Sequence, residues 1–151
     1  MTKTIAFDDL PTLVGQETGV SDWVEITQDR INKFADATGD HQWIHVDVAR
    51  AAKEMPGGKT IAHGYLTLSL IPWLTGDFLK VDGVTRALNY GSDKVRFTNM
   101  VPVGGKVRAR SKMLSAEPKS GGMQMRSEVT IEIEGQSRPA CIAETISLVF
   151  K

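Results

Sequence analysis

Hydrophobic residues recur at helical spacing in two segments of the first half of the chain. In segment 27–37 the apolar positions are Ile31, Phe34, Ala35 and Ala37, with Thr27 before them and Gly39 after them. Thr is a favourable N-cap and Gly a favourable stop, so this pattern predicts a short amphipathic helix. A second segment, from Gly64 to about Leu74, has Leu or Ile at positions 66, 68, 70, 71 and 74. It leaves hardly any polar face, which predicts a buried helix.

The second half of the chain alternates polar and apolar residues instead. Between Lys106 and Met113 every even position is Lys or Arg, and every odd position is apolar or small. After a turn signal over residues 118–122, a second run alternates Met123, Met125, Val129, Ile131 and Ile133 with polar residues. Both runs are typical of strands with one wet face and one face toward a core.

These two runs are expected to pair as an antiparallel hairpin centred near Ser120. That register sets Lys106 opposite Glu134, Arg108 opposite Glu132 and Lys112 opposite Glu128. Opposite charges then face each other across the strands, which favours this pairing. It places Val107, Ile131 and Ile133 inside and the charged residues outside.

Two further runs, about 87–97 and 140–150, complete at least four predicted strands. An antiparallel sheet packed by one buried helix belongs to the α+β class. The length of 151 residues suits a single domain, expected to span residues 1–151.

Charge and composition narrow the classes of function. The 18 Lys and Arg balance the 18 Asp and Glu, so no global field favours nucleic acid or a membrane surface as partner. Residues 1–20 hold no apolar run of signal-peptide length, and no later stretch has the ~20 apolar residues of a membrane helix. The single cysteine, Cys141, cannot form an internal disulfide and is expected in the core. We therefore expect a cytoplasmic protein.

The chemically informative stretch is the loop 38–45 between the predicted helices, Thr-Gly-Asp-His-Gln-Trp-Ile-His. It places Asp40 and His45 five residues apart. Asp and His are a natural pair for moving protons to and from water near neutral pH. The alternative is structural: Asp40 caps the following turn and His45 fills a half-buried position. The spacing alone leaves both interpretations open.

A second candidate element is segment 60–64, Thr-Ile-Ala-His-Gly, directly before the apolar helix. Backbone N–H groups at a helix N-terminus lack intrahelical acceptors and carry the positive end of the dipole, which suits a carbonyl oxygen gaining negative charge. Gly64 offers such a group without a side chain that would block the approach. The alternative is that Gly64 only lets the helix pack closely.

Residues 34–45, followed six positions later by Ala51, resemble the signature of the MaoC-like, (R)-specific enoyl-CoA hydratases. Segment 61–64 also resembles the start of that family's central helix, and the rest of the chain fits in length and order. The most similar subgroup carries Gly-Asp-His-Gln-Trp-Ile-His and the run Asn89-Tyr90-Gly91, and it includes nodulation-protein-N-like proteins.

The resemblance implies a hot-dog fold, in which an antiparallel β-sheet wraps around the long helix that begins near Gly64, and a homodimer. It implies that Asp40 and His45 hold the water added to a trans-2-enoyl-CoA, giving (R)-3-hydroxyacyl-CoA. The Gly64 N–H would bind the thioester carbonyl. Such a hydro-lyase needs no metal and no cofactor, since coenzyme A enters as part of the acyl-CoA substrate.

The sequence departs from the family pattern at two positions. Gln42 stands where the family often has Asn, and Trp43 where it has Pro. The loop path and the shape of the acyl pocket are therefore expected to differ. Two rival functions stay open: a hot-dog acyl-CoA thioesterase and a non-catalytic acyl-CoA-binding module.

Five other residues are weaker candidates for substrate contacts. Lys59, Lys94 and Arg96 would reach the phosphates of coenzyme A or be plain solvated charge, and Asn89 and Tyr90 would line the cleft or pack in a strand. The run 57–60, Gly-Gly-Lys-Thr, superficially resembles a phosphate loop, but position 53 is Lys rather than Gly. The three histidines show no recognised zinc spacing, so no metal site is expected.

Overall fold

The structure is a computed structural model that describes residues 2–151. Its helical elements are η1 (Phe7–Leu13), α1 (Gln28–Thr38), α2 (Trp43–Val46), α3 (Val48–Glu54), η2 (Pro56–Gly58), α4 (Gly64–Ser69) and α5 (Ile71–Thr75). Its strands are β1 (Lys3–Ala6), β2 (Glu17–Val20), β3 (Val24–Glu25), β4 (Leu79–Asp82), β5 (Arg86–Arg96), β6 (Lys106–Lys119), β7 (Gly122–Ile133) and β8 (Cys141–Phe150).

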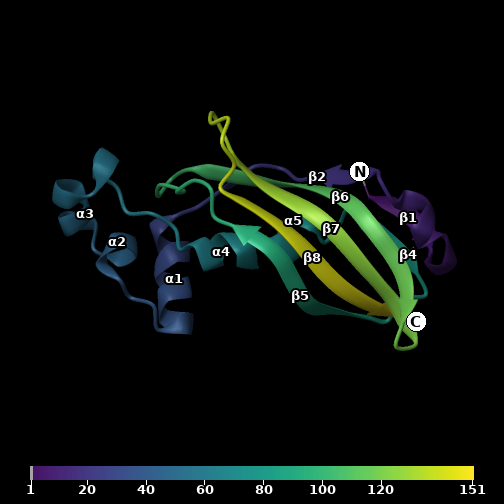
Figure 1. Cartoon of the computed structure of the whole chain (residues 1–151). Coiled ribbons are helices and arrows are strands. Elements are labelled where there is room, and N and C mark those ends of the chain that lie inside the picture. The colour runs from purple at the N-terminus through teal and green to yellow at the C-terminus, as the bar shows by residue number, and fades with distance from the viewer. Residues whose placement is uncertain (1) are drawn as a thin grey trace.

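The main sheet is antiparallel, in the order β2-β6-β7-β8-β5, with β3 also paired to β6. It curves around α4 and α5, while α1, α2 and α3 gather at one end of the molecule (Figure 1). At the other end β1 and β4 form a small parallel pair. An antiparallel sheet packed by a helical segment is the α+β arrangement that the sequence pattern predicts, and its wrapping around that segment is what the family resemblance implies.

The predicted hairpin is confirmed in its register. Arg108 pairs with Glu132 and Lys112 with Glu128. The inward residues Val107, Ile131 and Ile133 are at most 3% exposed. The predicted turn over 118–122 is too long, however, because β6 runs on to Lys119 and β7 starts at Gly122. Ser120 and Gly121 alone form the turn, with positive φ angles of 54° and 80°, as a two-residue hairpin turn requires.

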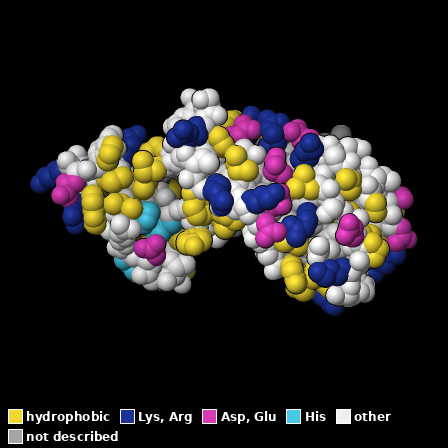
Figure 2. All heavy atoms as spheres, in the orientation of Figure 1, with side chains coloured by type: hydrophobic (Ala, Val, Ile, Leu, Met, Phe, Trp, Pro, Cys, Tyr) yellow, Lys and Arg dark blue, Asp and Glu magenta, His cyan; other side chains and the backbone are white. Residues whose placement is uncertain are grey.

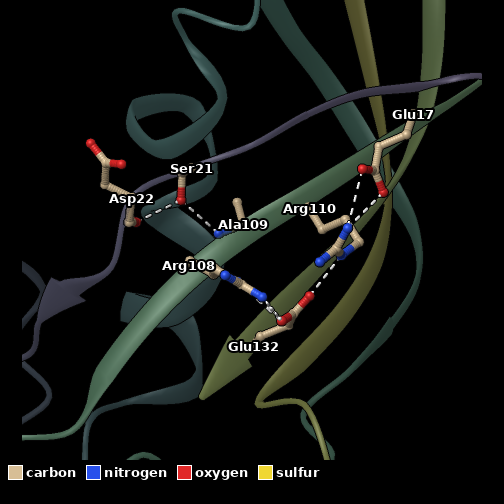
Figure 3. Close-up of polar contacts among 7 residues, drawn as sticks. All are labelled: Glu17, Ser21, Asp22, Arg108, Ala109, Arg110 and Glu132. Atoms are coloured by element: carbon tan, nitrogen blue, oxygen red, sulfur yellow. Dashed lines mark hydrogen bonds and ion pairs between the residues drawn. The ribbon is translucent and has the colours of Figure 1, made fainter. Parts of the chain in front are cut away.

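The outer face of this hairpin carries paired charges. Figure 3 shows Arg108 and Arg110 of β6 converging on Glu132 of β7, with Arg110 also bound to Glu17 of β2. Arg110 Nε lies 2.7 Å from one Glu132 oxygen, and Arg108 Nη2 lies 3.0 Å from the other. These hydrogen bonds, that from Arg110 foremost, lower the pKa of Glu132.

The first predicted helix is confirmed as α1, including both of its ends. The Thr27 side chain accepts a hydrogen bond from the Arg30 N–H, and Gly39 adopts the left-handed conformation, with φ of 82°. These caps matter for the site because α1 ends at Thr38, two residues before Asp40.

The central helix is not the single element that the sequence predicts, because it divides into α4 and α5. Pro72 has no N–H to donate to the Leu68 carbonyl, which interrupts the regular ladder. Hydrogen bonds from Leu70 to Leu66 and from Leu74 to Leu70 keep the two pieces in line. One face is buried as expected, but Tyr65 and Trp73 on the other are 68% and 56% exposed.

The core lies between these helices and the inner face of the sheet. Leu66, Leu70, Ile71 and Leu74 pack there against Ala109, Val129 and Ile131. Cys141 belongs to the same cluster, as predicted, and burial raises its pKa to about 11. Within residues 2–151, no helix is both long enough and apolar enough to span a bilayer.

Candidate active site

His45 is held in one tautomer by its backbone surroundings. The residue lies in the single turn of α2 and is 6% exposed. Its Nδ1 is 2.7 Å from the Ile61 carbonyl oxygen, which only accepts, so Nδ1 carries the proton and Nε2 keeps a free lone pair. Burial lowers the pKa of His45, and the nearby His63 lowers it further. The side chain is therefore a neutral base with its open nitrogen at Nε2.

Two polar side chains stabilise this turn through hydrogen bonds. Gln28 of α1 donates from Nε2 to the His45 carbonyl at 2.8 Å. Thr60 in turn donates to the Gln28 Oε1 at 2.5 Å. The position of His45 is thus fixed by contacts to two other segments of chain, α1 and residues 60–61, rather than by local helix propensity.

Asp40 lies in the loop directly after α1. Its carboxylate accepts a long hydrogen bond, 3.4 Å, from the Gln42 N–H. Asp40, His45 and His63 each offer one ligand-type atom, and these atoms all lie within 4.8 Å of one another. Two hydrogen bonds of ~2.8 Å to a single water span such a distance. The structure therefore brings together Asp40 and His45, as predicted, and adds His63.

His63 is the residue of this site that the sequence reasoning missed. Its ring stacks on that of His45, with centroids 3.8 Å apart and planes 23° apart, and Phe34 packs at 4.9 Å. Its Nε2 donates to the backbone carbonyl of Asp40 at 2.9 Å. The ring thus contacts both predicted catalytic residues. The only signal in the sequence was its position directly before Gly64.

The same geometry disfavours a metal ion, although the three residues are of metal-binding types. A bound ion lies close to the plane of each imidazole that ligates it. Two rings that are stacked and nearly parallel share no nearby point of this kind. In addition, His45 Nδ1 is already engaged by Ile61.

A cavity of about 350 Å³ opens beside this cluster, and we call it the catalytic cavity. Its lining comprises His45, Ile61, Ala62, Gly64, Thr67, Phe97, Thr98, Asn99, Met100, Val101, Arg138 and Ala140. Gly64 is the first residue of α4, so its N–H has no intrahelical acceptor. A Cβ at this position would lie 2.9 Å from the Phe97 ring, so glycine keeps the cavity open. Figure 2 shows histidine side chains on the helical end of the molecule, among hydrophobic ones.

The remaining predicted contacts are not brought to this cavity. Trp43 lies under the Arg50 guanidinium at 4.0 Å, and Gln42 precedes α2 as its N-cap. Lys94 pairs with Glu144, and Arg96 donates to the adjacent Val95 carbonyl. Lys59 is exposed in the segment after η2.

Asn89 and Tyr90 line a separate cavity on the α5 side. The basic residue in the lining of the catalytic cavity is instead Arg138, which the sequence analysis did not select. The roles predicted for Lys59, Lys94 and Arg96 at the phosphates stay predictions.

Comparison with known proteins agrees with this architecture. Residues 9–135 match the MaoC like domain family. The chain is 52% identical over 139 residues to 3-hydroxyacyl-thioester dehydratase Z of Mycobacterium tuberculosis, covering 91% of each chain. It is 44% identical over 147 residues to nodulation protein N of Rhizobium leguminosarum bv. viciae, covering 96% of this chain and 91% of that protein.

Solved structures show the same fold. An unliganded (R)-hydratase from Pseudomonas aeruginosa superposes with a TM-score of 0.74 at 24% identity, over 91% of this chain and 82% of that one. An (R)-hydratase from A. caviae gives 0.71 at 24% identity, over 89% and 94%. The chain therefore adopts the hot-dog fold and belongs to the MaoC-like domain family.

Proposed function

We propose that this protein is a hydro-lyase that adds water to a trans-2-enoyl thioester of coenzyme A to give the (R)-3-hydroxyacyl thioester, and that it catalyses the reverse dehydration. The observation that carries the proposal is the pairing of a neutral His45 with the Asp40 carboxylate, within reach of one water and beside the Gly64 N–H. A relative named for 3-hydroxyacyl-thioester dehydration, at 52% identity, supports it.

In the proposed mechanism the thioester carbonyl accepts a hydrogen bond from the Gly64 N–H. This bond stabilises negative charge on the oxygen and withdraws electrons from C3, an effect worth roughly 10²–10³-fold in related oxyanion sites. The water donates one hydrogen bond to Asp40 and the other to His45 Nε2. As the water oxygen bonds to C3, His45 takes its proton and then delivers a proton to C2. Acid/base help of this kind contributes roughly 10²–10⁴-fold.

The proposed steps use no metal and no cofactor beyond the coenzyme A of the substrate. The direct test follows the loss of enoyl-thioester absorbance with crotonyl-CoA, then chiral analysis of the 3-hydroxyacyl product. Release of free thiol without hydration would identify a thioesterase instead. Binding of acyl-CoA without any turnover would identify a binding module. Either result would contradict the proposal.

The proposal includes a homodimer. Strand β5 is an 11-residue edge strand of the main sheet, and its Leu88 and Tyr90 are 50% and 60% exposed. An exposed, partly apolar edge of this length readily accepts another strand. Tyr65 and Trp73 add apolar surface on the open face of the helices. Light scattering at micromolar concentration should give twice the monomer mass, and a monomer mass would refute the assembly.

A further inference from the structure

The inner face of the main sheet is interrupted by a row of hydroxyl side chains. Ser111 of β6, Ser127 of β7 and Thr145 and Ser147 of β8 form this row, which we call the hydroxyl belt. Ser127 pairs with Thr145 across two neighbouring strands, and Ser147 pairs with Met125. Inward positions to one side are Val129 and Ala143, and those to the other are Met123 and Val149. The belt therefore separates two hydrophobic clusters of one continuous face.

A cavity of about 420 Å³, the distal cavity, lies over the belt. It is also lined by Thr18 and Thr75 and by apolar residues such as Met113 and Val81. Thr75 donates to the Ile71 carbonyl and Thr145 weakly to the Ser127 carbonyl. The hydroxyl groups of Ser111, Ser127 and Ser147 pair with no other side chain or backbone group among residues 2–151. They are free to bond an occupant.

Three cavities lie along α4 and α5 between the catalytic residues and this belt, and the first two have neighbouring helix residues, Thr67 and Leu68, in their linings. The catalytic cavity includes Gly64 and Thr67. A middle cavity of about 420 Å³ starts at Leu68 and ends at Thr75. The middle and distal cavities share Thr75, Thr145 and Ser147. At 1.5 Å per helical residue the distance from Gly64 to Thr75 is ~16 Å, which about 13 bonds of an extended acyl chain cover at ~1.2 Å each.

The charges indicate which part of a thioester enters this route. Arg138 lines the catalytic cavity, whereas the linings of the middle and distal cavities contain no charged residue. The phosphates of coenzyme A require cations or backbone donors, so the carrier fits at the Arg138 side. The acyl chain is then the part that follows α4 and α5. A plain hydrocarbon tail would exclude water from the belt hydroxyls without offering them a hydrogen-bond partner, which is unfavourable.

We propose that the hydroxyl belt binds an oxygen function, such as a hydroxyl or keto group, on the distal part of a long acyl chain. The preferred substrate class is thus a long-chain enoyl thioester oxygenated about a dozen or more carbons from the carbonyl. Asn89 and Ser92 of β5, in the lining of the middle cavity, extend the polar surface along the route. The inference rests on the proposed hydration function and names its substrate class.

The test compares trans-2-enoyl-CoA substrates of about 12 to about 16 carbons with and without a terminal hydroxyl group. The wild-type protein should prefer one of the hydroxylated chains over its plain counterpart by at least ~10-fold in kcat/KM, because a site built to hydrogen-bond discriminates against the analogue that lacks the group. The double variant Ser127→Ala, Thr145→Val keeps the side-chain volumes nearly unchanged. It should reduce this preference to about twofold or less. Each rate is normalised to that on crotonyl-CoA, which reports general damage.

Thr130→Val is the matched control, because Thr130 lies on β7 and alternates to the opposite face from Ser127 and Val129. It should leave the preference unchanged. Equal wild-type rates on plain and hydroxylated chains would overturn the inference. The inference would also be overturned if the double variant lost as much kcat/KM on crotonyl-CoA as on the hydroxylated chain, because the belt would then contact the carrier arm.

A binding measurement separates this inference from the proposed function. Titration calorimetry with saturated acyl-CoA thioesters of the same lengths requires no turnover. If no substrate is hydrated but the hydroxylated chain still binds at least ~10-fold tighter, the hydration proposal fails and the belt inference stands. If hydration proceeds and neither assay shows a preference, the belt inference alone fails.

Discussion

The Asp40, His45 and His63 site and the Glu132, Arg108 and Arg110 cluster are both groups of ionisable side chains, but they differ in surroundings. On the outer face of the hairpin, both oxygens of Glu132 are bonded to arginines at a partly solvated surface. In the site, His45 is buried and keeps Nε2 open, and His63 Nδ1 is buried without a partner among residues 2–151. The Glu132 carboxylate therefore already has its hydrogen-bond partners. The site keeps ring nitrogens that can still form hydrogen bonds, which suits a group that acts on a substrate.

The largest expected effect is the loss of an ionisable group from the site. Asp40→Asn keeps the shape of the side chain and should lower the hydration rate by at least ~100-fold, with acyl-CoA binding retained. His45→Gln should do the same. The double variant should lose less than the product of the single effects, because both groups act on one water.

Hydration rates and melting temperatures should be measured on the same samples. If the two residues only cap and pack the loop, melting temperatures fall while the rate per folded molecule stays nearly intact. A folded Asp40→Asn protein that retains more than about half of the wild-type rate would falsify the acid/base assignment.

The second effect is a pH dependence set by His45. Burial and the neighbouring His63 lower its pKa below the ordinary value of 6.5, while Asp40 and the Ile61 carbonyl raise it. The neutral form is the proposed base, so kcat/KM should be flat at neutral pH and fall about tenfold per pH unit below a midpoint under 6.5. A midpoint clearly above 6.5 would contradict this protonation state.

The same shift affects stability in a defined window. Because the folded-state pKa of His45 lies below its unfolded value, the unfolded chain binds more protons between the two values. The contribution of His45 is therefore complete above pH 6.5 and is lost as the pH falls toward the folded-state pKa. In His45→Gln, the unfolding free energy should lose this part of its pH dependence.

A third, smaller effect is expected at His63, which contacts no substrate in the proposed mechanism. His63→Gln keeps a donor for the Asp40 carbonyl but removes the ring that stacks on His45. We expect roughly a tenfold lower kcat with little change in KM, since orientation is lost rather than a reacting group. The acid limb of the pH profile should also move upward, because His63 lowers the pKa of His45. An unmoved pH profile would reduce His63 to a packing role.

The parts of this molecule that sequence predicted are those encoded by local patterns. The register of β6 and β7 follows from alternation and matched charges, and α1 follows from Thr27 and Gly39 at its ends. The parallel pairing of β1 with β4 does not follow from a local pattern. Each strand has only four residues, which show too little alternation, and the two strands lie far apart in the chain. The division of the central helix was readable from Pro72 but was not predicted.

The site divides in the same way. Asp40 and His45 lie in one short motif, so resemblance to a family located them. The stack of His63 on His45 joins segments 18 residues apart, and the hydroxyl belt joins three strands. Single serines and threonines in alternating strands look like ordinary sheet positions until the strands are paired. The phosphate contacts predicted for Lys59, Lys94 and Arg96 had no such geometric guide and stay predictions, and Arg138, which lines the catalytic cavity, was not among the predicted residues.

The smallest effect is expected on the outer face, where Glu132→Gln removes the charge between Arg108 and Arg110. Its side chain is 25% exposed and the arginines are 28% and 40% exposed, so solvent screens the pairs. We expect a loss of about 1 kcal/mol or less in unfolding free energy and an unchanged hydration rate.

The arginines lower the pKa of Glu132 below 4.5, so its contribution to stability is present above pH 4.5 and disappears as the pH falls through the folded-state pKa. Denaturant unfolding at low and at 1 M salt should show the difference shrinking in salt. Glu128→Gln, at an exposed position on the same face, is the matched control and should cost less. Loss of activity in Glu132→Gln would show that the two clusters are coupled through the sheet.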